Sequence, residues 1–117
     1  MSNILRFHVG PRMSEAAVHN GVVYLAGQVP EDGSADIKGQ TQQVLDAIDK
    51  LLTETGSAKS HILRAQIFLA DLADFAAMNE VWEQWVVAGQ TPPRATVHAA
   101  LAKPEWKLEI VVTAAVA

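Results

Sequence analysis

An arginine at the head of an apolar run is the residue of this sequence with the clearest chemical potential. Arg94 follows Pro92 and Pro93 and precedes Ala95-Thr96-Val97. The prolines fix an extended approach and keep the residues before them out of the helical region. An arginine in such a run is costly to bury without an anionic partner, and its planar guanidinium holds a carboxylate through two parallel hydrogen bonds. The sequence therefore predicts a small acidic ligand held by Arg94.

Glu109 is the second candidate, and it lies in an expected strand over residues 107–115. It alternates with Leu108 and Ile110, so it projects from the face opposite to theirs. A carboxylate there is suited to accept a proton from an attacking water. A solvated carboxylate on an exposed strand face, or an ion pair with Arg94, is the alternative.

Three more polar side chains belong to the same hypothesis. Arg94, Thr96 and His98 alternate along an expected strand over residues 94–100, so they share one face. Asn79 projects about 40° from Phe75 on an expected helix, taking roughly 100° per residue. Since this position lies inside the apolar stripe, the amide needs a hydrogen-bond partner, either a ligand or a structural one.

Hydrophobic periodicity predicts the elements that position these residues. Asn20-Gly21 predicts a tight hairpin turn between two strands, and Gly89 is the expected end of the second helix. The pattern ββαβαββ, preceded by a short strand, favours an α+β fold with both helices on one face of a mixed sheet. The expected strands cover residues 4–9, 15–19, 22–27, 61–70, 94–100 and 107–115, the expected helices cover 36–55 and 74–88, and the second helix is expected to bury Phe75, Met78, Trp82, Trp85 and Val86.

Composition excludes several classes of function. The 117 residues suit one domain, 1–117, and contain no cysteine, which excludes thiolate chemistry. The net charge is −4 without a basic cluster, so no nucleic acid partner is expected. No apolar run is long enough to span a membrane and no signal sequence is visible, so a cytoplasmic location is expected. The four histidines lack metal-ligand spacing, so no metal is expected.

Four segments, in this order and at compatible spacing, resemble the RidA/YjgF family of reactive-intermediate deaminases. They are Ala26-Gly27-Gln28-Val29-Pro30, residues 68–79, Pro92-Pro93-Arg94-Ala95-Thr96-Val97 and Leu108-Glu109-Ile110. The resemblance extends from about Ser14 to the end of the chain. It implies a chorismate-mutase-like (YjgF-like) fold and a homotrimer with sites between subunits.

The resemblance also implies roles for individual residues. Arg94 corresponds to the clamp on the substrate carboxylate, and backbone donors near Thr96 orient that carboxylate. Glu109 corresponds to the residue that positions the attacking water, and Asn79 corresponds to a residue close to the ligand cleft. Ala26 and Gly27, at the end of the second expected strand, correspond to further ligand contacts.

Two positions depart from the family pattern. Ala26 replaces a serine that often touches the ligand. Met13, or Arg12 if the alignment shifts by one residue, replaces a tyrosine that lines the cleft in deaminase-active members. The carboxylate clamp and the water-positioning acid are therefore present, whereas the aromatic wall and the small hydroxyl are not.

Two functions from different classes follow. The first is hydrolysis of small enamines or imines, such as 2-aminoacrylate and 2-iminopropanoate, to 2-keto acids and ammonia without a cofactor. The second is a binder or sensor of small carboxylates without turnover, which modulates a partner enzyme. The resemblance also allows ribonuclease or chaperone-like action, and the acidic balance of the chain opposes the first of these.

Overall fold

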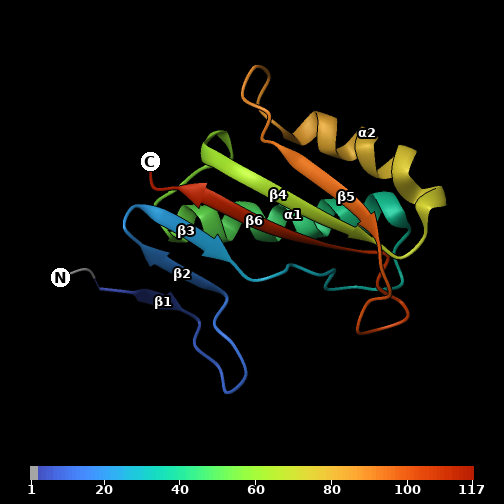
Figure 1. Ribbon diagram of the computed structural model, residues 1–117. Coiled ribbons are helices and arrows are strands. Elements are labelled where there is room, and N and C mark those ends of the chain that lie inside the picture. Colours follow the sequence, from blue (N-terminus) through green and yellow to red (C-terminus); the bar gives the residue numbers. More distant parts are fainter. Residues whose placement is uncertain (1–2) are drawn as a thin grey trace.

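The computed structural model describes residues 3–117 as one six-stranded sheet with two helices behind it (Figure 1). Helix α1 and helix α2 both cover the same face of the sheet, as the sequence pattern predicts. The elements are β1 Leu5–Phe7, β2 Ala16–His19, β3 Val22–Leu25, α1 Ile37–Glu54, β4 Ile62–Leu69, α2 Phe75–Trp85, β5 Arg94–His98 and β6 Leu108–Ala115, with single 3-10 turns at Lys59–His61 and Leu72–Asp74.

The sheet is mixed, with the strand order β1-β2-β3-β6-β4-β5. Strand β6 pairs antiparallel with both β3 and β4, and only β4 and β5 run parallel. A parallel pair needs a long crossover, and α2 supplies it. The Asn20-Gly21 turn joins β2 and β3 as predicted, with positive φ at both residues. The architecture is therefore the α+β fold expected from the sequence.

Helix α1 begins and ends where local chemistry dictates. The carboxylate of Asp36 caps its N-terminus by accepting a hydrogen bond from the backbone N–H of Gly39, at 2.8 Å. At the other end Gly56 takes a φ of 83°, which glycine adopts without strain. The helix then packs a row of apolar side chains onto the sheet.

The core lies between α1, α2 and one face of the sheet. Strands β4 and β6 alternate buried and accessible residues, so each contributes one side chain in two to this core. The other side chains of both strands lie on the open face. Fully buried core members include Val44, Leu45, Ile48, Leu52, Ala65, Ile67, Leu69, Met78, Leu108, Ile110 and Val112.

Helix α2 differs from the prediction at both ends. It ends at Trp85 rather than at residue 88, because Val86 has an extended backbone with ψ 155°. Two consecutive β-branched valines follow Trp85, and such residues favour a helix only weakly. Phe75 was expected in the core but is 42% exposed, because it occupies the first turn of the helix. Within residues 3–117, no helix combines the length and apolar character needed to cross a membrane.

Candidate functional site

The register between β4 and β5 fixes the direction in which Arg94 points. Arg94 lies opposite Ala65, Thr96 opposite Ile67, and His98 opposite Leu69. Paired residues share a face of the sheet, and these β4 residues are buried toward the helices. The predicted common face of the three β5 side chains is thus confirmed, and it is the face covered by α2.

Arg94 is a half-buried cation held against aromatic rings. Its guanidinium carbon lies 5.3 Å from the centre of the Trp82 ring and 5.9 Å from that of Phe75, within cation–π range. Burial lowers the pKa of Arg94 from its ordinary value, and the charge of Glu83 acts in the opposite direction. In the described part of the chain Arg94 has no ion-pair partner, so the alternative of a pair with Glu109 is wrong.

Two polar atoms of the same region are buried and lack hydrogen-bond partners within residues 3–117. They are Oδ1 of Asn79, on α2, and Oγ1 of Thr96, on β5. No structural hydrogen bond to the Asn79 amide oxygen therefore forms within residues 3–117. An unsatisfied buried polar atom costs about 1–3 kcal/mol, so it calls for an ordered water, a ligand or a second chain to complete it. Arg94, Thr96 and Asn79, here called the Arg94 group, thus combine a cation with two polar atoms that have no partner within the described chain.

Glu109 lies on the other face of the sheet. It pairs with Phe68 of β4, whereas its neighbours Leu108 and Ile110 are fully buried toward the helices. Its carboxylate rests on Gly27, where an added Cβ would lie 2.0 Å from Oε2 of Glu109. Only glycine permits this close approach, which explains the residue type at position 27.

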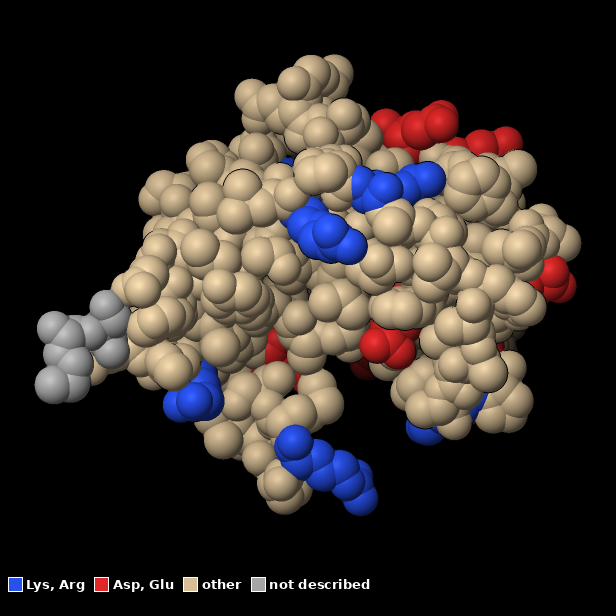
Figure 2. Space-filling view, in the orientation of Figure 1, with Lys and Arg blue, Asp and Glu red and all other residues tan. Residues whose placement is uncertain are grey.

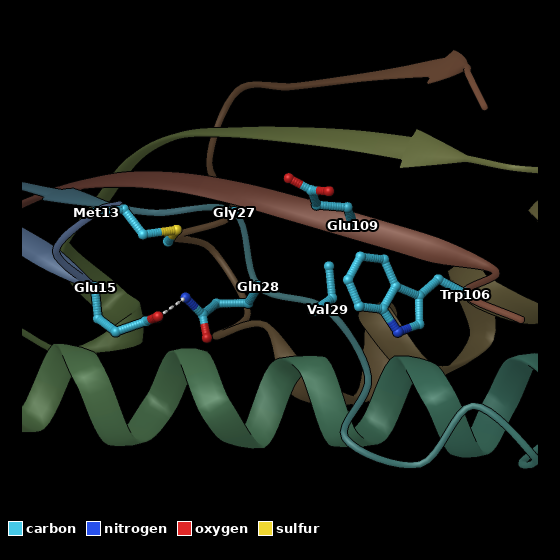
Figure 3. Close-up of a pocket in the computed structure, with 7 residues that line it drawn as sticks. All are labelled: Met13, Glu15, Gly27, Gln28, Val29, Trp106 and Glu109. Atoms are coloured by element: carbon cyan, nitrogen blue, oxygen red, sulfur yellow. Dashed lines mark hydrogen bonds between the residues drawn. The ribbon is translucent and has the colours of Figure 1, made fainter. Parts of the chain in front are cut away.

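A pocket of about 400 Å³ opens beside this carboxylate. Figure 3 shows Glu109 above β6 and Glu15 below it, with Met13 toward the same side as Glu15 and Trp106 at the opposite end. In the space-filling view the surface is indented between the two loops that carry Met13 and Trp106 (Figure 2). The lining residues are Met13, Glu15, Gly27, Gln28, Val29, Trp106 and Glu109.

Gln28 ties the parts of this pocket together. Its backbone N–H donates to the carbonyl of Ile110 at 2.8 Å, and the N–H of Ile110 donates back at 3.1 Å. Its side-chain amide donates to Oε2 of Glu15 at 2.9 Å and to the carbonyl of Ala26 at 3.1 Å. The Gln28 side chain is only 8% exposed, so Glu15 is held from inside the protein.

The predicted site residues fall into two groups. Glu109, Gly27 and Met13 meet in the pocket, while Arg94, Thr96 and Asn79 form the Arg94 group where β5 packs against α2. Ala26 takes part through its backbone alone, since its carbonyl accepts from Gln28.

Two of the residues considered in the sequence, His98 and Arg12, lie outside both groups, and two lining residues, Glu15 and Trp106, were not predicted. His98 is exposed with its ring nitrogen 3.0 Å from the carbonyl oxygen of Ala70, and Arg12 lines an adjoining pocket of about 290 Å³. Sequence reasoning did not assign Glu15 or Trp106 to the site. For Glu15 the spacing of two from Met13 in an extended segment was an available signal. No cluster of three or more His, Cys, Asp or Glu side chains suited to a metal ion occurs among residues 3–117.

Comparison with known proteins agrees with the fold and the sequence motifs. Residues 6–116 match the model of the family described as endoribonuclease L-PSP. A RutC family protein from Haemophilus ducreyi is 51% identical over 97% of both chains. The RutC family protein YoaB from Escherichia coli is 50% identical over 97% of this chain and 98% of its own.

Solved structures give the same result. A YjgF-family protein from Neisseria meningitidis superposes with a TM-score of 0.94 at 50% identity, covering 97% of this chain and 94% of its own. An uncharacterised protein from Pseudomonas aeruginosa superposes with a TM-score of 0.95 at 44% identity, covering 97% of this chain and 98% of its own. The chain therefore belongs to the RidA/YjgF family, whose members include the proteins named RutC.

Proposed function

We propose that this protein hydrolyses small reactive enamines and imines that carry a carboxylate, of the 2-aminoacrylate and 2-iminopropanoate type, to 2-keto acids and ammonia. The observation that carries the proposal is the state of Arg94. It is a half-buried cation without an internal acid, next to two buried polar atoms that lack partners. A half-buried guanidinium without an internal acid suits a small anion such as a carboxylate.

The reaction needs positioning and one proton relay. Arg94 binds the substrate carboxylate through two hydrogen bonds, and backbone donors near Thr96 orient that carboxylate. Glu109 accepts a proton from water as the oxygen bonds to the imine carbon. It returns that proton to the nitrogen, which gives a carbinolamine. It then takes the hydroxyl proton of the carbinolamine and passes it to the nitrogen, so the carbon–nitrogen bond breaks and ammonia leaves as the keto group forms. An enamine first becomes the imine by gaining a proton on its terminal carbon and losing one from nitrogen. Water enters, ammonia departs and no electrons are exchanged, so bound geometry supplies most of the acceleration.

The two groups of residues imply a site shared between copies. Arg94 and Glu109 point from opposite faces of one sheet, so a six-atom substrate cannot touch both in one chain. The family resemblance supports a homotrimer, in which the Arg94 group of one copy faces the pocket of the next.

A second candidate function is carboxylate binding without turnover, as in a sensor that modulates an enzyme. It is favoured by Met13 and Ala26, which stand where the resemblance leads us to expect a tyrosine and a serine. The description of the matched family as an endoribonuclease is a weaker guide. The net charge of −4 and the scattered basic residues do not supply the positive surface that RNA binding needs.

The test is ammonia release from freshly generated 2-iminopropanoate by the wild type, Arg94→Ala and Arg6→Ala. Loss of a charge-assisted contact costs about 1.5–3 kcal/mol, so kcat/KM of Arg94→Ala should fall by roughly ten- to a hundredfold. Arg6 is exposed on the edge strand β1, so its removal controls for the loss of a positive charge. No rate above background for the wild type would refute the deaminase proposal.

Two further measurements separate the alternatives. Thermal stabilisation by pyruvate that Arg94→Ala abolishes, in the absence of turnover, would favour the binder. If sites are shared, co-refolding the impaired variants Arg94→Ala and Glu109→Gln should give a mixture more active than either variant alone, because some sites then combine an intact Arg94 group with an intact pocket. A mixture no more active than the separate variants, despite exchange of subunits, would contradict the shared site.

A further inference from the structure

One end of the pocket is a single indole ring carried by a short turn. The backbone N–H of Trp106 donates to the carbonyl of Lys103 at 3.2 Å and closes a turn over residues 103–106, here called the Trp106 turn. Pro104 stands at its second position, where a fixed φ is favoured. The ammonium of Lys103 lies 5.4 Å from the centre of the indole ring and covers one of its faces. Figure 3 shows the ring beside Val29, so the turn determines where this end of the pocket lies.

Gln40, in the first turn of α1, is fully buried and holds the Trp106 turn against the helix. Its Nε2 donates to the carbonyl oxygen of Glu105 at 3.0 Å, and its Oε1 accepts the backbone N–H of Lys107 at 2.8 Å. The same Nε2 lies 3.1 Å from the carbonyl oxygen of Gly33 and 3.0 Å from that of Ala35. One side chain therefore joins the Trp106 turn, the loop before α1 and the residue before β6.

Glycine lets the loop before α1 pack directly on the turn. A Cβ added to Gly33 would lie 2.4 Å from Cγ of Glu105 and 3.0 Å from its Cβ, so a side chain at this position would push the loop and the turn apart. Without the Gln40 amide, the carbonyl of Glu105 and the N–H of Lys107 would be left without partners inside the protein, which is costly. The turn would then move outward to reach water, and Trp106 would move with it.

Glu109 is held in place by contacts that do not involve Gln40. Strand β6 pairs with β4 at Glu109 and on both sides of it, and Ile110 exchanges two backbone hydrogen bonds with Gln28. A shift of the Trp106 turn therefore changes one wall of the pocket and leaves the carboxylate where it is.

We infer that Gln40 is a positioning residue of the site, which fixes the ring of Trp106 through the Trp106 turn and so sets how tightly a substrate is bound. This inference rests on the proposed function. In that reaction the imine carbon lies at Glu109, so the side chain of the substrate extends into the pocket and contacts the ring. Gln40 itself is buried and touches no substrate. Its loss should therefore raise KM and leave kcat almost unchanged.

The experiment measures steady-state ammonia release from the imine of 2-aminohexanoate, generated in the assay by an amino-acid oxidase, for the wild type, Gln40→Met and Gly33→Ala. Gln40→Met keeps the length of the side chain and removes its hydrogen bonds. Gly33→Ala pushes on the turn with Gln40 intact, and its backbone accepts alanine because its φ is not in the left-handed region. Each variant should raise KM about tenfold, which corresponds to the lost burial of one or two methylene groups, and should keep kcat within about twofold.

Three controls separate positioning from general stability. Gln43→Met changes a glutamine of the same helix whose side chain, within residues 3–117, hydrogen-bonds to Asp32 alone, so KM should stay at the wild-type value. Leu45→Ala weakens the core and should also leave KM unchanged. Combining Gln40→Met with Trp106→Ala should give the KM of Trp106→Ala, because both changes remove the same wall.

The position of the ring is observed directly by fluorine NMR of protein labelled with 5-fluorotryptophan. The signal of Trp106, assigned by its absence in Trp106→Phe, should shift in Gln40→Met. The signals of Trp82 and Trp85, which are buried on α2, should not shift.

The outcomes are distinguishable. An unmoved Trp106 signal in Gln40→Met, a fall in kcat with unchanged KM, or an equal rise in KM in Gln43→Met overturns the inference while the proposed function stands. If Gln40→Met does not fold, Gly33→Ala decides by the same measurements. No ammonia with the wild type overturns the proposed function instead, and the inference is then decided by the Kd of 2-oxohexanoate, measured by isothermal titration calorimetry. A Kd about tenfold weaker in Gln40→Met supports the inference, and equal Kd values, or no binding by the wild type, overturn it.

Discussion

Replacing Gly27 with alanine displaces the carboxylate of Glu109 without removing it. An alanine Cβ at this position would lie 2.0 Å from Oε2 and 2.8 Å from the carboxyl carbon of Glu109, whereas real Cβ contacts essentially never fall below 3.0 Å. The oxygen must therefore retreat by about 1 Å. The φ of Gly27 is not in the left-handed region, so the backbone accepts alanine.

The expected loss follows from this displacement. A shift of about 1 Å in a group that places the nucleophile can cost on the order of a hundredfold in rate. Stability should change much less, because the displaced atoms are the end of a flexible and partly exposed side chain. We expect kcat for 2-iminopropanoate to fall about a hundredfold in Gly27→Ala, with a change in unfolding free energy below ~1 kcal/mol.

The measurement is steady-state ammonia release combined with urea unfolding, on Gly27→Ala, Glu109→Ala and the double variant. If alanine acts only through Glu109, the double variant should be no slower than Glu109→Ala, since the two changes remove one shared function. Gly39→Ala, a change of the same kind on α1 that meets Ala35 and Asp36, should keep the wild-type rate. A Gly27→Ala protein with at least half of the wild-type kcat would refute the assigned role of Glu109, as would additive losses in the double variant.

Two predictions concern the elements that support the site. Asp36→Ala removes the carboxylate that accepts a hydrogen bond from the backbone N–H of Gly39, so urea unfolding should show a free energy of unfolding lower by ~1 kcal/mol. Asp36→Asn keeps a side-chain acceptor and should lose less. Equal losses in the two variants would contradict the capping role. Leu45→Ala empties a fully buried position between α1 and the sheet and should cost about 2–5 kcal/mol by the same method, while the exposed Gln42→Ala should cost far less. A loss below ~1 kcal/mol in Leu45→Ala would show that the core collapses around the missing side chain.

Much of the fold was predictable because its local signals agree with one another. The hairpin of β2 and β3 follows from the turn chemistry of Asn20-Gly21. The length of α1 follows from its capping and its uninterrupted apolar stripe. The two errors, in the burial of Phe75 and in the end of α2, occur where the position of a residue in the fold outweighs its local sequence pattern. Phe75 fits the stripe of α2 but sits in its first turn, beside Arg94 and away from the densest packing. The end of α2 depends on Val86, for which helical and extended conformations compete.

The sequence predicted which residues share a face within each strand, but not which residues of different strands come together in the site. Alternation shows that Arg94 and Thr96 share a face of β5, and that Glu109 opposes Leu108 on β6. It does not show which faces of two distant strands coincide, because that depends on the pairing register through β4. Glu15 was missed for a related reason, since its importance comes from the Gln28 amide, a contact across thirteen residues.

The register through β4 also bears on the proposed site between copies. Phe68 pairs with Glu109 on one side and with Val97 on the other, so these three side chains form a row on the open face. Arg94 belongs to the row of Ala65, on the covered face. The row with Glu109 includes Val97, which is 42% exposed and lies beside the carboxylate of the proposed reaction. Covering that face with a second copy, as the proposed shared site requires, would bury Val97 and bring the partner's Arg94 group toward Glu109. Assembly and catalysis would then depend on the same row, so a charge introduced at Val97 should weaken both together.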